Sequence, residues 1–427
     1  AELSLFPPPV SGSGVTMGTW RGLRVAFIIG SLFMILLIIV YWDDVRGFSL
    51  YPLQDPKHEP LDLALIPQTT PVPSCSISAS TVRPSPLLSL PTTRSSTPPH
   101  PSEQEEGRAA VKRIDEEMAR EKKRVDNSHQ EERKQRLADV CAGKGSLEFP
   151  GKTRAFDQIP NRELDHLIVD DTHQIIYCYV PKVACTNWKR VMVVLSQSLV
   201  SPSSGKPYTD PEAVPPDLVH NSSIHLTFAK FWRHYGSLSR HLMALKLQHY
   251  TKFLFVRDPF VRLISAFRNK FGKPNEDFYR QFGSVMLSRY GNVSGGVPKT
   301  AAEAFAAGIK PTFQQFITYL LDPQTERETA FNEHWRQVYR LCHPCQIQYD
   351  FIGRLETLET DSEQLLRILG VDHLIRFPTG ARNRTAASWE RDWFAQIPMD
   401  MRRKLYKLYE PDFELFGYPK PDSVLHR

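Results

Sequence analysis

The pattern of apolar and polar positions divides the chain into three kinds of segment. Val25–Trp42 contains no charged residue, and about 20 apolar residues span the hydrocarbon core of a bilayer. Residues 43 to about 105 are rich in Pro, Ser and Thr and offer few positions for a packed core. From about Gly145 onward, apolar and aromatic residues return in short runs that alternate with amphipathic ones.

The region after Gly145 predicts alternating strands and helices. Three apolar runs with β-branched and aromatic residues predict strands, at Ile175–Val180, Phe253–Val256 and Tyr349–Gly353. Amphipathic runs predict helices over residues 188–195, 228–247, 261–271, 362–369 and 401–409. This alternation predicts an α/β fold with a central, mostly parallel sheet flanked by helices.

The charges around the apolar segment predict its orientation in a membrane. Arg21 and Arg24 precede it and two aspartates follow it, which leaves residues 1–24 in the cytosol and sends the rest into the lumen. The alternative is a cleaved signal peptide, but this apolar run exceeds the usual 7 to 15 residues and no small-residue cleavage site follows. We therefore expect an uncleaved signal-anchor over residues 25–42. Residues 1–16 precede Met17 and are interpreted as upstream sequence.

The segment between the anchor and the globular region is predicted to be a lumenal stem over residues 43–144. Its first part should be extended and solvated, and residues 103–137 carry alternating charges with strong helix formers. Val111, Ile114, Met118 and Val125 follow a heptad spacing, but Glu121 and Ser128 interrupt it. A coiled coil needs three or more sustained heptads, so we favour a single charged helix over a coiled-coil dimer. Residues 145–427 form the predicted catalytic domain.

Six cysteines suit a lumenal protein, because disulfides persist in oxidising compartments. Six cysteines allow 15 full pairings. Cys342 and Cys345 have the spacing of half a zinc ribbon, but no second such pair accompanies them. A redox role is an alternative. A structural disulfide is the favoured interpretation.

Two short motifs carry the candidate chemistry. Pro181–Asn187 follows the first predicted strand, and Arg257–Ser265 follows the second; each precedes an amphipathic run. Turns between a strand and a helix N-terminus are where α/β proteins hold phosphate groups. Each motif offers a cation and a hydroxyl, so the pair predicts a nucleotide with phosphate at both ends.

The absence of glycine from the first motif excludes familiar nucleotide folds. A phosphate-binding loop of the kinase type needs G-x-x-x-x-G-K-[ST], and a dinucleotide fold needs G-x-G-x-x-G. Pro181–Asn187 has no glycine. A nucleotide kinase is therefore disfavoured, although dependence on a metal would restore that alternative.

The two motifs together resemble those of sulfotransferases that use 3′-phosphoadenosine 5′-phosphosulfate. Four further segments are similar to those of the Golgi chondroitin and dermatan 4-O-sulfotransferases: 177–190, 332–335, 342–345 and 416–419. The resemblance implies a single-pass type II Golgi membrane enzyme with a lumenal catalytic domain. It implies sulfate transfer to the 4-hydroxyl of N-acetylgalactosamine in chondroitin, and in desulfated dermatan. The donor motifs are shared with relatives that sulfate other positions, so those remain alternatives.

The resemblance also implies roles for individual residues. The first motif is implied to hold the 5′-phosphosulfate and the second the 3′-phosphate. Lys182 is the predicted catalytic cation at the bridging oxygen, with the following backbone amides and the Thr186 hydroxyl around the 5′-phosphate. Asp258 is predicted to cap the helix, with Pro259 in its first turn. The full donor site comprises Pro181, Lys182, Val183, Ala184, Cys185, Thr186, Asn187, Arg257, Asp258, Pro259, Phe260, Val261, Arg262, Leu263, Ile264 and Ser265.

The base that takes the proton from the acceptor hydroxyl is predicted to be a histidine, the usual choice near neutral pH. His225 lies between the motifs, where some related uronyl sulfotransferases carry their catalytic histidine, and it is the first candidate. His334, beside Glu333, is the main competitor. His220 is disfavoured because it adjoins a possible glycosylation site at Asn221.

The net charge and the glycosylation sequons bear on the acceptor and on modification of the chain. The chain carries a net charge of +6, and basic runs such as residues 230–240 could line a groove for a polyanionic glycan. The same runs could bind nucleic acid, which a lumenal domain does not meet. N-glycosylation is predicted at Asn221, Asn292 and Asn383. No carboxylate cluster suits a metal, so none is expected. A non-catalytic glycan-binding protein on the same scaffold is a further alternative.

Overall fold

The structure is a computed structural model that describes residues 101–293, 295–378 and 392–426. The chain divides into two units, residues 1–95 and 96–427, and every described residue belongs to the second. The predicted cytosolic tail, the anchor and the Pro-rich part of the stem lie outside the described residues, as do Cys75 and Asn383. Within the described ranges, no helix has the length and apolar character needed to cross a membrane.

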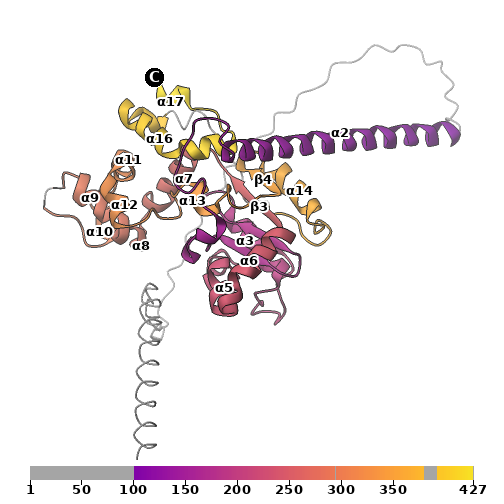
Figure 1. Cartoon of the computed structure of the whole chain (residues 1–427), viewed down its shortest axis with the longest axis horizontal. Coiled ribbons are helices and arrows are strands. Elements are labelled where there is room, and N and C mark those ends of the chain that lie inside the picture. Colours follow the sequence, from indigo (N-terminus) through magenta and orange to yellow (C-terminus); the bar gives the residue numbers. More distant parts are fainter. Residues whose placement is uncertain (1–100, 294, 379–391, 427) are drawn as a thin grey trace, which may run out of the picture. The chain divides into compact units, whose positions relative to one another are not determined.

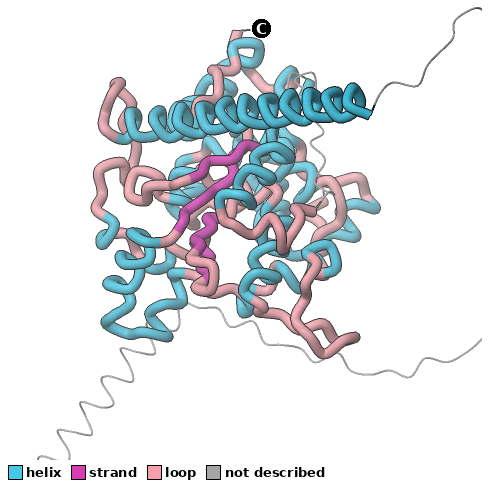
Figure 2. Tube along the Cα trace, turned by 90° about the vertical axis from the view of Figure 1, so that its right-hand side faces the viewer, coloured by secondary structure: helices cyan, strands magenta, loops and turns pink. Residues whose placement is uncertain are grey.

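A four-stranded sheet forms the centre of the described unit. Its order is β1 (Leu167–Asp170), β2 (Ile175–Cys178), β3 (Thr251–Val256), β4 (Phe351–Arg354). β2, β3 and β4 are parallel, whereas β1 is antiparallel to β2. Figure 2 shows these strands enclosed by helices. The predicted mostly parallel sheet is confirmed, and the antiparallel strand β1, which was not predicted, is added at one edge.

Helices connect the strands and cover the sheet. The longer ones are α2 (Pro101–Cys141), α3 (Cys185–Ser196), α5 (Phe228–Tyr235), α6 (Ser239–His249), α7 (Pro259–Phe271), α11 (Phe313–Leu321), α14 (Leu358–Ile368) and α16 (Met399–Phe416). Shorter ones are α4 (Pro216–Val219), α8 (Glu276–Phe278), α9 (Ser284–Tyr290), α10 (Ala301–Ala306), α12 (Pro323–Glu328), α13 (Val338–Cys342) and α17 (Asp422–Leu425). In Figure 1, α3, α5 and α6 gather to one side of the strands, and α7, α13 and α16 to the other.

The helix predicted over residues 228–247 is divided into α5 and α6. Gly236 has a φ of 53°, a value that glycine adopts at little cost. A single 3-10 turn, Gly236–Leu238, joins the two helices. The glycine therefore divides one predicted amphipathic helix into two consecutive helices.

Aromatic packing holds the helices against the sheet. The Trp188 ring from α3 is fully buried, with its centroid 4.9 Å from the rings of both Phe253 and Phe255 on β3. Phe255 in turn lies so close to Gly353 of β4 that a Cβ there would be 2.2 Å from the ring. Burial of such large side chains contributes about 1.5–3 kcal/mol each. Only glycine fits at residue 353, because the neighbouring strand carries this ring.

The last part of α2 covers the open edge of β4. The Gln130 side-chain amide donates to the Ile352 carbonyl (3.2 Å), and the Ile352 N–H donates to Gln130 Oε1 (3.0 Å). Arg133 donates to the same carbonyl and pairs with Asp361 at 2.8 Å. A glutamine side chain thus replaces the neighbouring strand that an edge would otherwise attract. The charged helix expected for the stem is therefore α2, and its C-terminal third belongs to the packed unit upstream of residue 145.

Two disulfides connect distant segments. Cys178 of β2 is bonded to Cys342, and Cys141 at the end of α2 to Cys345. The expectation of structural disulfides is confirmed, with Cys342 and Cys345 bonded to different elements and not to each other. Among the described cysteines only Cys185 is free.

Candidate active site

The turn between β2 and α3, residues 181–184, is the Pro181 loop. Lys182 and Ala184 have φ values of 71° and 52°, left-handed conformations that residues with a side chain seldom adopt. Ala184 is also the residue that precedes α3, whose first backbone amides have no partner within the helix. Strain of this kind concentrates at functional sites. The first amides of α3, at the end of this loop, are therefore the candidate donors for an anion.

Lys182 is the cation at the centre of this loop. Its ammonium group donates to Asn269 Oδ1 on α7. Burial, followed by the charge of Lys270, lowers the pKa of Lys182 to about 8. An ammonium group that is costly to keep charged gains most from a bound anion, so the electrostatics favour a negatively charged ligand here.

Arg257 joins the second motif to the first. Its Nη1 lies 3.4 Å from the Lys182 carbonyl, and its Nε is buried without a hydrogen-bond partner among the described residues. A buried donor without an acceptor is costly. Ser265 lies within α7, which begins two residues after Arg257, and is partly exposed. The Arg257 Nε–H is thus an unused donor that could bind an anion beside the Pro181 loop.

The start of α7 follows the prediction. Asp258 accepts hydrogen bonds from the Phe260 and Val261 amides at 2.9 and 3.0 Å, and Pro259 occupies the first turn. Burial raises the pKa of the Asp258 carboxyl to about 6. The predicted capping roles are confirmed.

Arg262 is a buried residue that connects two segments of the site. Its side chain is 2% exposed and donates to three backbone carbonyls, those of Pro181 (3.0 Å), Glu333 (2.8 Å) and Arg336 (2.7 Å). Each of its three nitrogens donates to a backbone carbonyl, so Arg262 positions the Pro181 loop against the 332–336 segment. The structure therefore assigns it to positioning, whereas the sequence grouped it with the donor contacts.

The other motif residues divide between surface and core. Ala184, Cys185 and Thr186 are partly exposed at the start of α3. The buried members are Pro181, Val183, Asn187, Pro259, Phe260, Leu263 and Ile264; Val261 is partly buried. Asn187 Nδ2 donates to the Pro378 carbonyl at 3.2 Å. The buried residues hold the two motifs in shape, and the exposed ones can touch a ligand.

His220, which the sequence disfavoured, lies at the site. Its Nε2 is 3.0 Å from the Thr186 hydroxyl, and burial followed by the charge of Lys189 lowers the pKa of its ring. The contact joins residues 34 positions apart in the chain. No sequence pattern links the two, since α3, a long loop and α4 intervene.

His334 is held as a proton acceptor. Its Nδ1 lies 2.7 Å from Asn332 Oδ1, an acceptor, so Nδ1 carries the proton and Nε2 presents a lone pair. Phe278 packs edge-on against the ring at 5.4 Å, and Lys270 lies over the same Phe278 ring. Burial, followed by the charges of Lys270 and Lys182, lowers the pKa of His334 to about 2. The ring is therefore neutral in the ligand-free protein.

The His225 ring is bonded to the end of α4. Only 5% of it is exposed, and its Nε2 lies 2.8 Å from the Val219 carbonyl, to which it donates. Burial lowers the pKa of His225 to about 4. The residue closes a turn in front of α5, whereas the His334 ring lies in the field of Lys270 and Lys182.

Glu333 completes the cluster. Its Oε2 accepts from the Tyr179 hydroxyl at 3.3 Å and lies 3.4 Å from His166 Nε2. The Lys189 ammonium lies 3.6 Å from the centre of the Tyr179 ring. The neighbourhood of the Pro181 loop thus combines lysines and Arg257 for an anion with a carboxylate and a neutral imidazole for a hydroxyl.

The two described sequons are on the surface. Asn292 is exposed. Asn221 is also exposed, with its Oδ1 accepting from the Ser223 amide at 2.9 Å. Glycosylation at either position remains a prediction. In the described residues, no group of three or more His, Cys, Asp and Glu side chains is arranged to hold a metal ion.

Comparisons with known proteins give consistent matches. Residues 165–419 match the sulfotransferase family. Carbohydrate sulfotransferase 12 of Xenopus laevis is 54% identical over 416 residues, which cover 93% of this chain and 97% of the relative. The Mus musculus protein of that name is 53% identical over 420 residues, 95% and 99% of the two chains. Carbohydrate sulfotransferase 11 of Rattus norvegicus is 41% identical over 294 residues, 68% and 76% of the two. No solved structure matches the chain significantly.

Proposed function

We propose, from the premise that this chain belongs to the sulfotransferase family, that it sulfates the 4-hydroxyl of N-acetylgalactosamine in chondroitin and in desulfated dermatan. The sulfate donor in this proposal is 3′-phosphoadenosine 5′-phosphosulfate. The observation that carries it is the juxtaposition of Lys182 in the strained Pro181 loop with the unpartnered Nε of Arg257.

The residues present fit this donor. The amides at the start of α3 and the Thr186 hydroxyl suit the 5′-phosphate. Arg257 and Ser265 suit the 3′-phosphate, because a buried guanidinium with a free donor gains most from a doubly charged anion. Lys182 can stabilise the charge that develops on the bridging oxygen as it leaves the sulfur.

The acceptor chemistry is assigned to His334. Its Nε2 takes the proton of the sugar hydroxyl while the hydroxyl oxygen forms a bond to sulfur and the sulfur–phosphate oxygen bond breaks. The leaving bisphosphate keeps that electron pair, held by Lys182. Negative charge bound between Lys182 and Lys270 would raise the pKa of His334, since those two cations are what lower it after burial.

The choice of acceptor sugar and of the hydroxyl that is sulfated rests on sequence similarity to known sulfotransferases. The curated relatives are named carbohydrate sulfotransferases, and the resemblance in the Asn332–Trp335 segment extends to the residues that face the acceptor in this proposal. We also propose the Golgi membrane as the location, with residues 25–42 as a type II signal-anchor and the catalytic domain in the lumen.

A transfer assay tests the proposal. A form comprising residues 101–427 is incubated with the radiolabelled donor and desulfated chondroitin, in the presence of a metal chelator. Label should enter the polysaccharide, and Lys182→Ala and Arg257→Ala should each remove nearly all of it. Binding of adenosine 3′,5′-bisphosphate without transfer to any glycan would support a non-catalytic glycan-binding protein instead.

A further inference from the structure

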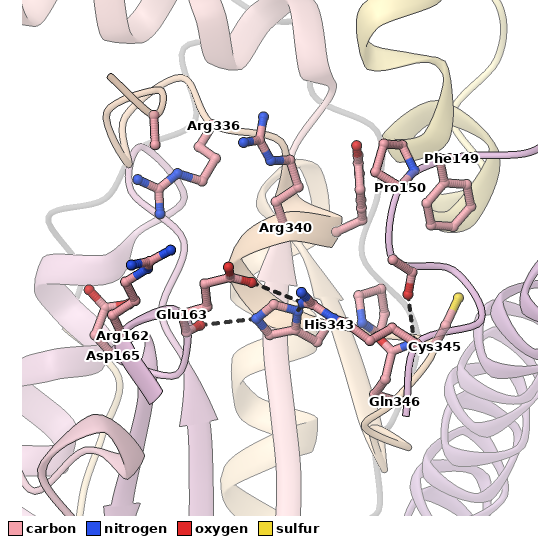
Figure 3. A pocket seen from close by; sticks show the side chains of 15 residues that line it. Phe149, Pro150, Arg162, Glu163, Asp165, Arg336, Arg340, His343, Cys345 and Gln346 are labelled. Atoms are coloured by element: carbon pink, nitrogen blue, oxygen red, sulfur yellow. Dashed lines mark hydrogen bonds and ion pairs between the residues drawn. The ribbon is translucent and has the colours of Figure 1, made fainter. Parts of the chain in front are cut away.

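A cavity of about 370 Å³ lies beside the candidate active site and is lined by four arginines (Figure 3). They are Arg154, Arg162, Arg336 and Arg340, accompanied by the carboxylates of Glu163 and Asp165. The volume falls in the lower part of the range for ligand pockets. So many guanidinium groups in one cavity favour an anionic ligand.

Two of these arginines, Arg162 and Arg336, make no ion pair with another described residue. Arg154 pairs with Glu163 at 2.9 Å, and Arg340 pairs with Glu326 at 2.6 Å, so both are largely neutralised. Arg336 uses its Nε on the Phe331 carbonyl (2.8 Å), which leaves its terminal nitrogens for a ligand. Arg162 is exposed and makes no hydrogen bond or ion pair with another described residue. In Figure 3 both groups lie on the side of the cavity where Asp165 is drawn.

The cavity also has the other features that a sugar needs. The Asp165 side chain is 49% exposed and accepts no hydrogen bond from another described residue, so its carboxylate can accept from a hydroxyl. Phe149, Pro150 and Tyr339 supply apolar surface for the C–H face of a ring. An anionic group, hydroxyls and a C–H face together describe a uronate residue.

The cavity and the active site share walls. Arg262 fixes the carbonyls of both Glu333 and Arg336, so one short segment presents Glu333 and His334 to the Pro181 loop and Arg336 to the cavity. On the other wall, Asp165 Oδ1 and Glu333 Oε2 lie 3.7 and 3.4 Å from the same nitrogen, His166 Nε2. Adjacent residues of one polysaccharide can therefore reach both places.

We infer that this cavity is an acceptor subsite, in which Arg162 and Arg336 bind the carboxylate of the uronate next to the sugar that is sulfated. The inference rests on the proposed function, since it assumes an alternating uronate polymer as acceptor. It assigns the cavity a part in acceptor recognition separate from the donor residues.

The test measures two acceptors with both the wild-type protein and an arginine variant. Desulfated chondroitin is compared with carboxyl-reduced chondroitin, in which each uronate becomes a neutral hexose. The wild-type protein should show a KM about 10-fold higher for the reduced acceptor, as expected for the loss of one charge-assisted contact. Arg162→Ala should raise the KM for chondroitin several-fold, leave the kcat nearly unchanged, and narrow the difference between the two acceptors, since Arg336 still contacts the carboxylate.

Three further measurements make the result interpretable. Arg367→Ala removes the same charge from an exposed position on α14 and should leave both KM values unchanged. Arg162→Glu should raise the KM for chondroitin further than alanine does. Unchanged binding of adenosine 3′,5′-bisphosphate would show that each variant is folded at the donor site.

The experiment distinguishes an error in the subsite from an error in the proposed function. If wild-type protein transfers sulfate to chondroitin but treats both acceptors alike, the subsite is wrong and the proposed function stands. The subsite is also wrong if Arg162→Ala changes both KM values equally. If the wild-type protein sulfates neither acceptor, the chondroitin proposal itself has failed.

Discussion

At the scale of single residues, the first prediction concerns the charge of Lys182. Because burial and Lys270 lower its pKa to about 8, a substantial part of the free enzyme loses this charge in mildly alkaline solution. The kcat/KM for the donor reports ionisations of the free enzyme, so we predict that it falls as the pH rises through about 8. A pH profile with the acceptor in excess measures this.

Lys182→Arg is the matched control, because a guanidinium group stays charged throughout that range. This variant should be slower than the wild type and should show no decline near pH 8. Lys182→Ala should lower the kcat by about 10²–10³-fold, the usual cost of removing one group that stabilises developing charge. A wild-type profile that stays flat from pH 7 to 9.5 would argue against an ionising Lys182.

The two candidate histidines give a second prediction. His334→Gln keeps a polar side chain of similar size but cannot take a proton, so we expect the kcat to fall by about 10²–10⁴-fold with donor binding retained. His225→Gln changes a buried ring bonded to Val219, so it should lower the melting temperature while the folded fraction keeps its activity. The reverse pattern would return the base to His225.

At the scale of elements, the sequence revealed the positions of both motifs but not what joins them. A strand followed by a turn and a helix is a local pattern, so the placement of Lys182 and Arg257 could be predicted. The bonds of Arg262 reach residues 71 to 81 positions away, and the His220–Thr186 contact depends on the path of a long loop. Such contacts depend on tertiary packing, which hydrophobic periodicity and secondary-structure propensity do not predict.

Arg262 gives the element-scale prediction. Arg262→Met leaves three backbone carbonyls without their donor, and each such buried group costs about 1–3 kcal/mol. We expect a lower free energy of unfolding and weaker donor binding, because the Pro181 loop and the 332–336 segment lose the side chain that bonds to both. Arg327→Met, an exposed arginine on α12, is the control. Unchanged stability and donor affinity in Arg262→Met would contradict the positioning role.

At the scale of the whole molecule, α2 is part of the catalytic unit. The predicted domain start at residue 145 would remove Gln130 and Arg133 from the edge of β4 and Cys141 from its disulfide with Cys345. A disulfide of this kind contributes about 2–4 kcal/mol. We therefore predict that residues 101–427 yield a stable monodisperse protein and that residues 145–427 aggregate, as size-exclusion chromatography would show.

A point variant isolates the edge contact from the loss of the helix. In the 101–427 form, Gln130→Ala should cost about 1–3 kcal/mol, because it leaves the Ile352 amide unpaired. Gln135→Ala removes an exposed glutamine that bonds only within α2, to Asp139, and should be nearly neutral. Equal effects of the two substitutions, measured by chemical denaturation, would show that α2 does not protect the sheet edge.

The most direct test of the central claim is the position of the sulfate in the product. Desulfated chondroitin labelled by the 101–427 form is digested with chondroitinase, and the disaccharides are separated. We predict label in the 4-sulfated disaccharide, and its loss with Lys182→Ala. Label in the 6-sulfated or uronate-sulfated disaccharide, or none in a protein that binds adenosine 3′,5′-bisphosphate, would contradict the claim.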